Sequence, residues 1–129
     1  MHKKKYNMTQ EDKNLLLKDL CGRLPYGVKG IVEDGIKVTT PSEWPVEKSI
    51  EFSMRYMVIK NGWKPYLFPL SSMTVRQGEE FATTLKYLHA EEIDIWTLDT
   101  YDWCNKNNFD YRGLIPKGLA IDATGLNIY

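Results

Sequence analysis

The sequence TQEDKNLLLKDLCGRLPYGVKGIVEDGIKVTT, residues 9–40, carries a helical pattern followed by a hairpin pattern. Thr9 is a favourable N-cap, because its hydroxyl can accept a hydrogen bond from an amide of the first helical turn. The leucines that follow recur at helical spacing, and Pro25 disfavours helical dihedral angles in the residue before it. We therefore expect a helix that starts after Thr9, ends near Pro25 and has one apolar face. Asp19 and Arg23 are expected to lie away from that face.

The second half of this stretch predicts a β-hairpin. Residues 28–32 and 36–40 contain several β-branched side chains, and Asp34-Gly35 between them suits the positive φ angles of a type I′ turn. Gly30 interrupts the first strand, which indicates a bulge or a close approach of another part of the chain. A helix followed by a hairpin is typical of an α+β protein.

A second pair of strands is expected after the hairpin. In residues 50–59, apolar and polar side chains alternate at first and the later ones are mainly apolar, which predicts a strand that runs from a wet edge into a covered interior. Residues 63–70 predict a shorter strand. Pro65 and Pro69 lack amide hydrogens, which places that strand at the edge of the sheet. Trp44, in the loop before these strands, is expected to cover the core.

A second helix is expected to begin at a capping box. In such a box, the side chains of Thr74 and Gln77 each bond the backbone amide of the other residue. The helix would then place three apolar side chains on one face: Phe81, Leu85 and Leu88. Residues 93–96 could add a strand to the sheet.

A third, short helix is expected after Asp99 or Thr100, ending near Asn108, because asparagine tolerates the left-handed conformation common at helix ends. Residues 109–129 contain several glycines and a proline. They predict packed irregular coil with at most one short strand.

These patterns together predict a single α+β domain over residues 9–129, preceded by a flexible basic tail at residues 1–8. We expect a small antiparallel sheet of three to five strands, open or barrel-like, with two to three helices packed against it. The predicted core side chains lie on the apolar faces of their elements: Leu16, Leu20, Phe52, Met54, Leu85 and Trp103.

The composition fits one such domain. Of the 129 residues, 43% are hydrophobic, which is enough to bury a core without a metal or a disulfide. The 17 basic and 17 acidic residues balance, whereas proteins that mainly grip phosphate backbones carry a basic excess. Cys21 and Cys104 are expected to be buried free thiols. Because the sequence has no apolar run of membrane length and no signal-peptide pattern, we expect a cytoplasmic protein.

Side chains that usually carry catalysis are sparse. The two histidines, His2 and His89, cannot build a multi-histidine metal site, and no glycine-rich phosphate loop is present. The carboxylates between Glu91 and Asp102 could act as a paired acid and base in glycoside hydrolysis, but a solvated face is the simpler interpretation. We therefore predict no catalytic residues, no metal and no cofactor, and favour a protein that is not an enzyme.

Five residues are candidates for binding. Asp110, Tyr111 and Arg112 follow one another, and Tyr and Arg are enriched at interface hot spots. The alternative for these three is an internal Asp–Arg pair under a tyrosine lid that holds the loop. Trp63 and Tyr66 are the other two candidates, because exposed aromatic rings on a small sheet can stack bases.

Three segments carry a resemblance to a known family: DLCGRLPYGV at residues 19–28, KPYLFPLSSMT at 64–74 and FDYRGLIPKGLA at 109–120. In these segments the chain resembles a family of small uncharacterised proteins from gut Bacteroidales genomes and their phages or other mobile elements. The resemblance spans the chain in order. It implies a bacterial or phage-encoded cytoplasmic protein, and it implies no activity, cofactor or catalytic residue.

Three functions follow as hypotheses. The first is a non-enzymatic binding or accessory protein with an unidentified protein partner and no membrane partner. The second is a nucleic-acid-associated protein that uses a small sheet with basic and aromatic residues. The third is a small hydrolase built on the acidic residues. An exposed apolar patch would favour the first, and exposed rings on a basic face would favour the second.

Overall fold

The computed structural model describes residues 8–32, 35, 37–44 and 50–129. Helix α1, Gln10–Arg23, begins as the sequence predicts, because the amide of Asp12 donates to the hydroxyl of Thr9 at 3.1 Å. A 3₁₀ turn over Leu24–Tyr26 then ends the helix. The predicted basic tail lies, apart from Met8, outside the described residues.

A four-stranded sheet is built around β2, Lys64–Pro69. β1, Gly30–Ile31, runs antiparallel to β2, whereas β5, Phe109–Asp110, and β6, Ile121–Asp122, run parallel to it. The sheet is therefore mixed rather than purely antiparallel, and it is not closed into a barrel. The last part of the chain contributes two short strands, where the sequence predicted at most one.

The central position of β2 corrects the prediction that its prolines place it at an edge. The amide hydrogens of Tyr66 and Phe68 point to the edge that carries β1 and β5, and the carbonyl of Leu67 points to the opposite edge, which carries β6. Pro65 and Pro69 share the orientation of Leu67, so the hydrogens they lack would face the β6 side. Since β6 pairs with only two residues of β2, the pairing of these two strands does not need amide hydrogens at Pro65 and Pro69.

The predicted first hairpin is present where Gly30 and Thr39 pair, with N···O distances of 2.9 and 2.8 Å. Its turn residue Asp34 lies outside the described residues. The close approach expected at Gly30 is confirmed, because a Cβ atom there would lie 2.3 Å from the ring of Trp63 and 2.4 Å from the carbonyl oxygen of Lys64.

The strand predicted for residues 50–59 is wrong. The structure has helix α2, Ile50–Arg55, continued by a π-helical turn over Tyr56–Lys60. Met54 and Val58 lie four residues apart and are both buried in the core. That spacing places two side chains on the same face of a strand and also of a helix. The side-chain pattern of this short, largely apolar segment therefore did not distinguish a strand from a helix.

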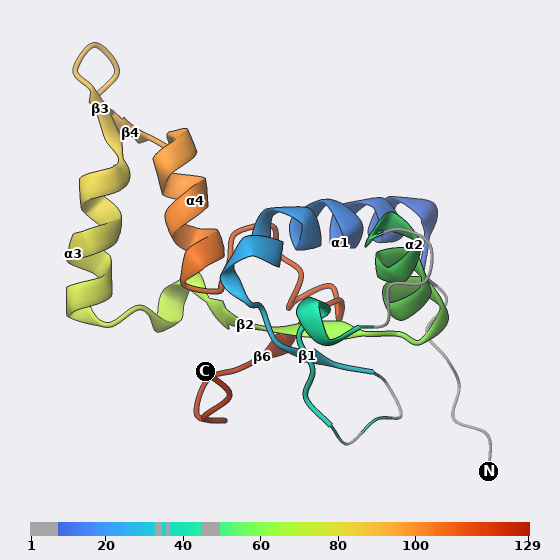
Figure 1. Ribbon diagram of the computed structural model, residues 1–129. Coiled ribbons are helices and arrows are strands. Elements are labelled where there is room, and N and C mark those ends of the chain that lie inside the picture. The colour runs from blue at the N-terminus through green and yellow to red at the C-terminus, as the bar shows by residue number, and fades with distance from the viewer. Residues whose placement is uncertain (1–7, 33–34, 36, 45–49) are drawn as a thin grey trace.

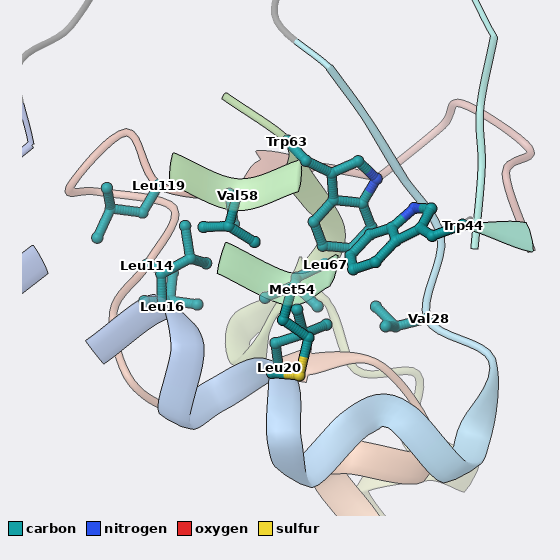
Figure 2. Packing of buried hydrophobic residues seen from close by; sticks show 11 residues of the cluster. Leu16, Leu20, Val28, Trp44, Met54, Val58, Trp63, Leu67, Leu114 and Leu119 are labelled. Carbon is teal, nitrogen blue, oxygen red and sulfur yellow. The ribbon is translucent and has the colours of Figure 1, made fainter. Parts of the chain in front are cut away.

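The hydrophobic core gathers side chains from α1, from α2 and the π-helical turn after it, and from β2, as Figure 2 shows. Trp44 packs edge-on against Trp63, with ring centroids 5.0 Å apart, and is only 4% exposed. Its predicted place over the core is therefore confirmed. The predicted core residues Leu16, Leu20 and Met54 are buried as well.

Residues 75–106 form a unit to one side of this core, called the arm below. It consists of α3, Val75–Thr84, β3, Lys86–Leu88, β4, Ile93–Ile95, and α4, Leu98–Lys106. Figure 1 shows the two helices next to each other, with the β3–β4 hairpin at the end of the arm that is far from β2. Within the described part of the chain, β3 and β4 pair only with each other, so residues 93–96 do not join the main sheet.

Both arm helices begin at capping boxes. Thr74 and Gln77 exchange the predicted reciprocal hydrogen bonds at 3.1 and 2.9 Å. Helix α4 begins earlier than predicted, with Thr97 as its N-cap. Helix α3 ends at Thr84, so Leu85 leaves the helix and is only half-buried.

Two other predicted core residues also differ from the expectation. Trp103 is half-buried, because it stacks on Phe109 at a centroid distance of 5.4 Å instead of entering the main core. The side chain of Phe52 lies outside the described part of the structure. The α+β class itself is confirmed, with four α-helices among the described residues where two or three were expected.

Candidate functional site

Asp19 and Arg23, one turn apart on α1, form an ion pair inside the protein. The Asp19 carboxylate accepts hydrogen bonds from Arg23 Nε at 2.8 Å and from Nη2 at 3.2 Å, and neither side chain is exposed. Arg23 also donates to the main-chain oxygens of Phe109, at 2.6 Å, and Cys104, at 3.4 Å. The guanidinium thus joins α1 to α4 and β5. The prediction that these two residues lie away from the buried face is wrong.

The predicted triplet Asp110, Tyr111 and Arg112 meets this ion pair. Arg112 Nε lies 3.3 Å from Asp19 Oδ1, so Arg112 pairs with Asp19 rather than with its neighbour Asp110. The carboxylate of Asp110 instead accepts the amides of Leu114 and Ile115, at 3.0 and 2.9 Å. The internal Asp–Arg pair therefore joins Arg112, which follows β5, to Asp19 on α1.

Tyr111 contacts two guanidinium groups. The Cζ atoms of Arg23 and Arg112 are 5.4 and 4.9 Å from the centroid of its ring, which are cation–π distances. Its hydroxyl donates to Oδ1 of Asn105 on α4 at 3.0 Å and accepts from Arg112 Nη2 at 3.3 Å. These contacts make the triplet part of the junction between the arm and the core. Arg112 keeps 22% of its side chain exposed there.

Trp63 and Tyr66 do not form an exposed pair of rings. Trp63 is fully buried and Tyr66 is only 9% exposed. Base stacking requires a ring face that is open to solvent. The exposed aromatic platform that the nucleic-acid hypothesis required is therefore absent at these two residues.

The acidic residues between positions 91 and 102 are exposed and spread over the hairpin loop, β4 and α4: Glu91, Glu92, Asp94, Asp99 and Asp102. Asp102 accepts a hydrogen bond from the hydroxyl of Tyr26, and this bond raises the pKa of that tyrosine. In the part of the chain that the structure describes, no three His, Cys, Asp or Glu side chains are grouped so as to hold a metal ion.

The two cysteines differ in their surroundings. Cys104 on α4 is buried, and burial raises the pKa of its thiol to about 11. Cys21 is exposed, so the prediction that both thiols are buried is wrong for this one. Cys21 follows the buried Leu20 directly on α1, but consecutive helical residues point in directions about 100° apart. The burial of Leu20 therefore does not bury Cys21.

The arm carries most of the exposed apolar side chains. Among the described residues nine large hydrophobic side chains are exposed, and six of them belong to the arm. These six are Val75, Tyr87, Ile93, Ile95, Leu98 and Tyr101. None of the six was expected from the sequence to be a contact residue, because exposure depends on which face of each short element the rest of the fold covers.

The interior of the arm is small and aromatic. Phe81 of α3 packs edge-on against Trp96 and Trp103, with centroid distances of 5.3 and 5.7 Å. The hydroxyls of Thr97 and Thr100 both donate to the carbonyl oxygen of Thr84, each at 2.9 Å. These contacts fix α3 and the hairpin to α4 and leave the outer faces of the arm uncovered.

A depression of about 340 Å³ lies outside the arm and is lined in part by the C-terminal residues Asn127 and Ile128. The cation at its wall, Lys29 Nζ, donates to the carbonyl oxygen of Ile128 at 2.9 Å. Because its main charged group is engaged by the chain itself, this depression is a weaker candidate than the arm.

The comparisons with known proteins add no relative: no protein-family model, no curated protein and no solved structure matches this chain. None of the described helices is both long enough and apolar enough to cross a membrane.

Proposed function

We propose that this chain is a protein-binding module and that the arm is its contact surface. The observation that carries the proposal is that six of the nine large hydrophobic side chains exposed among the described residues belong to the arm, where Leu98 is 88% and Tyr87 48% exposed. Five of the six lie in the β3–β4 hairpin or the first turn of α4, and large exposed apolar patches mark interaction sites. Aromatic residues such as Tyr87 and Tyr101 are also enriched among the residues that dominate binding energies.

The way the arm is attached supports this role. Helix α4 is held against α1 by the bond from Arg23 to the Cys104 carbonyl, and against the 3₁₀ turn after α1 by the bond from Tyr26 to Asp102. A surface held in one orientation loses little conformational entropy when it binds. In this proposal the triplet around Tyr111 positions the arm and does not itself contact the partner.

Two observations weigh against the other hypotheses. The nucleic-acid hypothesis needs exposed rings in a basic setting, but Trp63 and Tyr66 are buried. The hydrolase hypothesis needs two carboxylates that face each other, whereas the acidic residues between positions 91 and 102 are spread over the hairpin loop, β4 and α4 and are all exposed.

The proposal is tested by capture with the whole chain, the double variant Tyr87→Ser/Leu98→Ser and the control Leu126→Ser. Leu126 is 51% exposed and lies outside the arm, so the control removes a similar apolar side chain elsewhere. Proteins captured from an extract of the organism that encodes the chain are identified by mass spectrometry, and the best candidate is purified and titrated.

We expect the chain and the control to bind the purified partner equally and the arm variant to bind at least about tenfold more weakly, as for loss of hot-spot residues. Nuclease treatment of the extract should not change the capture. Equal binding by the arm variant, or capture that disappears with nuclease, would contradict the proposal.

A further inference from the structure

The β4 strand of the arm is exposed along its whole length. All three residues of this strand, Ile93, Asp94 and Ile95, are exposed, whereas Leu88 in the neighbouring strand β3 is half-buried. In the described part of the chain β4 pairs only with β3, so one row of its amide and carbonyl groups has no strand partner. Such an edge is a template for the addition of an extended segment.

The charge of the arm indicates what kind of segment it accepts. The arm contains seven carboxylates and three basic side chains, a net charge of −4 in a chain whose total charge is zero, and all ten are exposed. Asp94 lies in the middle of β4, and Glu91 and Glu92 lie in the adjoining loop. The other edge, on β3, carries Lys86 instead. A cationic segment is therefore attracted to the edge of β4 and repelled from that of β3.

A second copy of this chain is a poor occupant of the same edge. If two β4 strands paired antiparallel about their centres, Asp94 would lie directly opposite Asp94 of the other copy. Like charges directly opposite each other destabilise a strand pair. The acidic residue thus protects the edge from self-association and leaves it open to a partner of opposite charge.

We propose that the edge of β4 binds an extended segment of a partner protein in which a lysine or arginine is flanked by apolar residues. The basic side chain pairs with Asp94, and the apolar ones pack beside Ile93 and Ile95 on the other face. Asp94 is directly opposite Tyr87 in the hairpin, so the tyrosine ring lies on the face that receives the cation. This inference rests on the proposed protein-binding function and specifies the chemistry of the partner.

The test uses the full chain and synthetic peptides with an Ile-Lys-Ile or an Ile-Glu-Ile centre, titrated by NMR. We expect the lysine peptide to bind more tightly and to shift the backbone amides of residues 93–95. In a second pair of peptides, alternate backbone nitrogens are methylated. Since only every second amide of a strand faces its neighbour, one methylation pattern should abolish binding and the other should leave it nearly unchanged.

Two charge reversals separate local pairing from general attraction. Asp94→Lys and Asp99→Lys change the net charge by the same amount, and both residues are exposed. We expect Asp94→Lys to lower the affinity for the lysine peptide by about tenfold, because a cross-strand attraction becomes a repulsion. The same variant should bind the glutamate peptide more tightly than the unchanged chain does. Asp99→Lys should change either affinity by less than about threefold, since Asp99 lies outside the strand.

Equal effects of the two reversals, equal binding of both methylated peptides, or dimerisation of the chain through the hairpin in sedimentation would each overturn the inference. The protein-binding function is judged separately. If the double variant Tyr87→Ser/Leu98→Ser binds the purified partner more weakly but none of the peptides binds the chain, the arm remains a binding surface. Strand addition at β4 is then rejected.

Discussion

Nη2 of Arg23 lies 2.6 Å from the main-chain oxygen of Phe109, 86 residues further along the chain. The same guanidinium is paired with Asp19 and is fully buried. A buried arginine that holds both a carboxylate and distant main-chain oxygens joins parts of the chain that no local contact would bring together. Its removal leaves the carboxylate of Asp19 without its bidentate partner.

We therefore expect Arg23→Ala to lower the free energy of unfolding by about 3–5 kcal/mol, because breaking a buried pair leaves a poorly compensated buried charge. The measurement is a urea unfolding curve followed by circular dichroism. Arg76→Ala is the matched control, since Arg76 and Glu80 also form a pair four residues apart, but with side chains 90% and 52% exposed. The control should change stability by less than about 1 kcal/mol.

Arg112→Ala provides a graded comparison in the same experiment. Its side chain is 22% exposed, and Asp19 keeps its two hydrogen bonds from Arg23 in this variant. We expect Arg112→Ala to lower the free energy of unfolding by more than Arg76→Ala does and by less than Arg23→Ala does. Unfolding curves of Arg23→Ala and Arg76→Ala that coincide would contradict the structural role of the buried pair.

Gly30 and Gly78 should respond to alanine in opposite directions. A Cβ atom at Gly30 would lie 2.3 Å from the ring of Trp63, so Gly30→Ala should destabilise the protein by about 1–3 kcal/mol through overpacking. A Cβ atom at Gly78 in α3 would meet nothing within 4 Å, so Gly78→Ala should stabilise the helix by about 0.5–1 kcal/mol. Thermal melts of the two variants give the comparison, and shifts of equal sign would show that the packing around Gly30 is not as described.

The two thiols should label at very different rates. The thiolate is the reactive form, and burial raises the pKa of Cys104 to about 11 while also shielding the sulfur. In native buffer we expect one fast reaction with a thiol reagent, at Cys21, and a second only after unfolding. The variant Cys21→Ser should lose the fast reaction. A fast reaction that persists in Cys21→Ser would contradict the burial of Cys104.

Tyr129 should make stability depend on alkaline pH. Although 44% of the residue is exposed, its hydroxyl donates to the Tyr66 carbonyl oxygen at 2.7 Å and accepts the Lys29 amide at 2.9 Å. Desolvation raises the pKa of Tyr129 from 10.0 to about 12. The unfolded chain therefore ionises first, so the stabilisation is complete below pH 10 and is lost as the pH rises through 10 to 12.

Tyr129→Phe isolates this effect, because it keeps the ring that packs near Phe68 and removes only the hydroxyl. The free energy of unfolding of the variant should lie below that of the natural chain at pH 8, and the difference should shrink as the pH rises above 10. A difference that is constant with pH would show that ionisation of this hydroxyl is not coupled to folding.

Local signals in the sequence were sufficient wherever the partners lie within a few residues. The N-cap at Thr9 and the capping box of Thr74 and Gln77 could be predicted because a cap is completed inside one helical turn. Those caps follow from short-range geometry. The close approach at Gly30 could be predicted as well, since a glycine within a strand pattern marks a place where a Cβ atom does not fit, but its partners Trp63 and Lys64 lie far along the chain and could not be named.

Only the tertiary structure determined which strand is central, which charges are buried and which apolar residues stay in solvent. The burial of Asp19 and Arg23 depends on main-chain oxygens of Cys104 and Phe109, more than 80 residues away, and no helical pattern contains that information. The spacing of apolar side chains around Met54 fits both the two-residue period of a strand and the 3.6-residue period of a helix, and the segment forms a helix. The exposure of β4 likewise depends on the arm lying outside the main core, which is a property of the packed chain and not of any local segment.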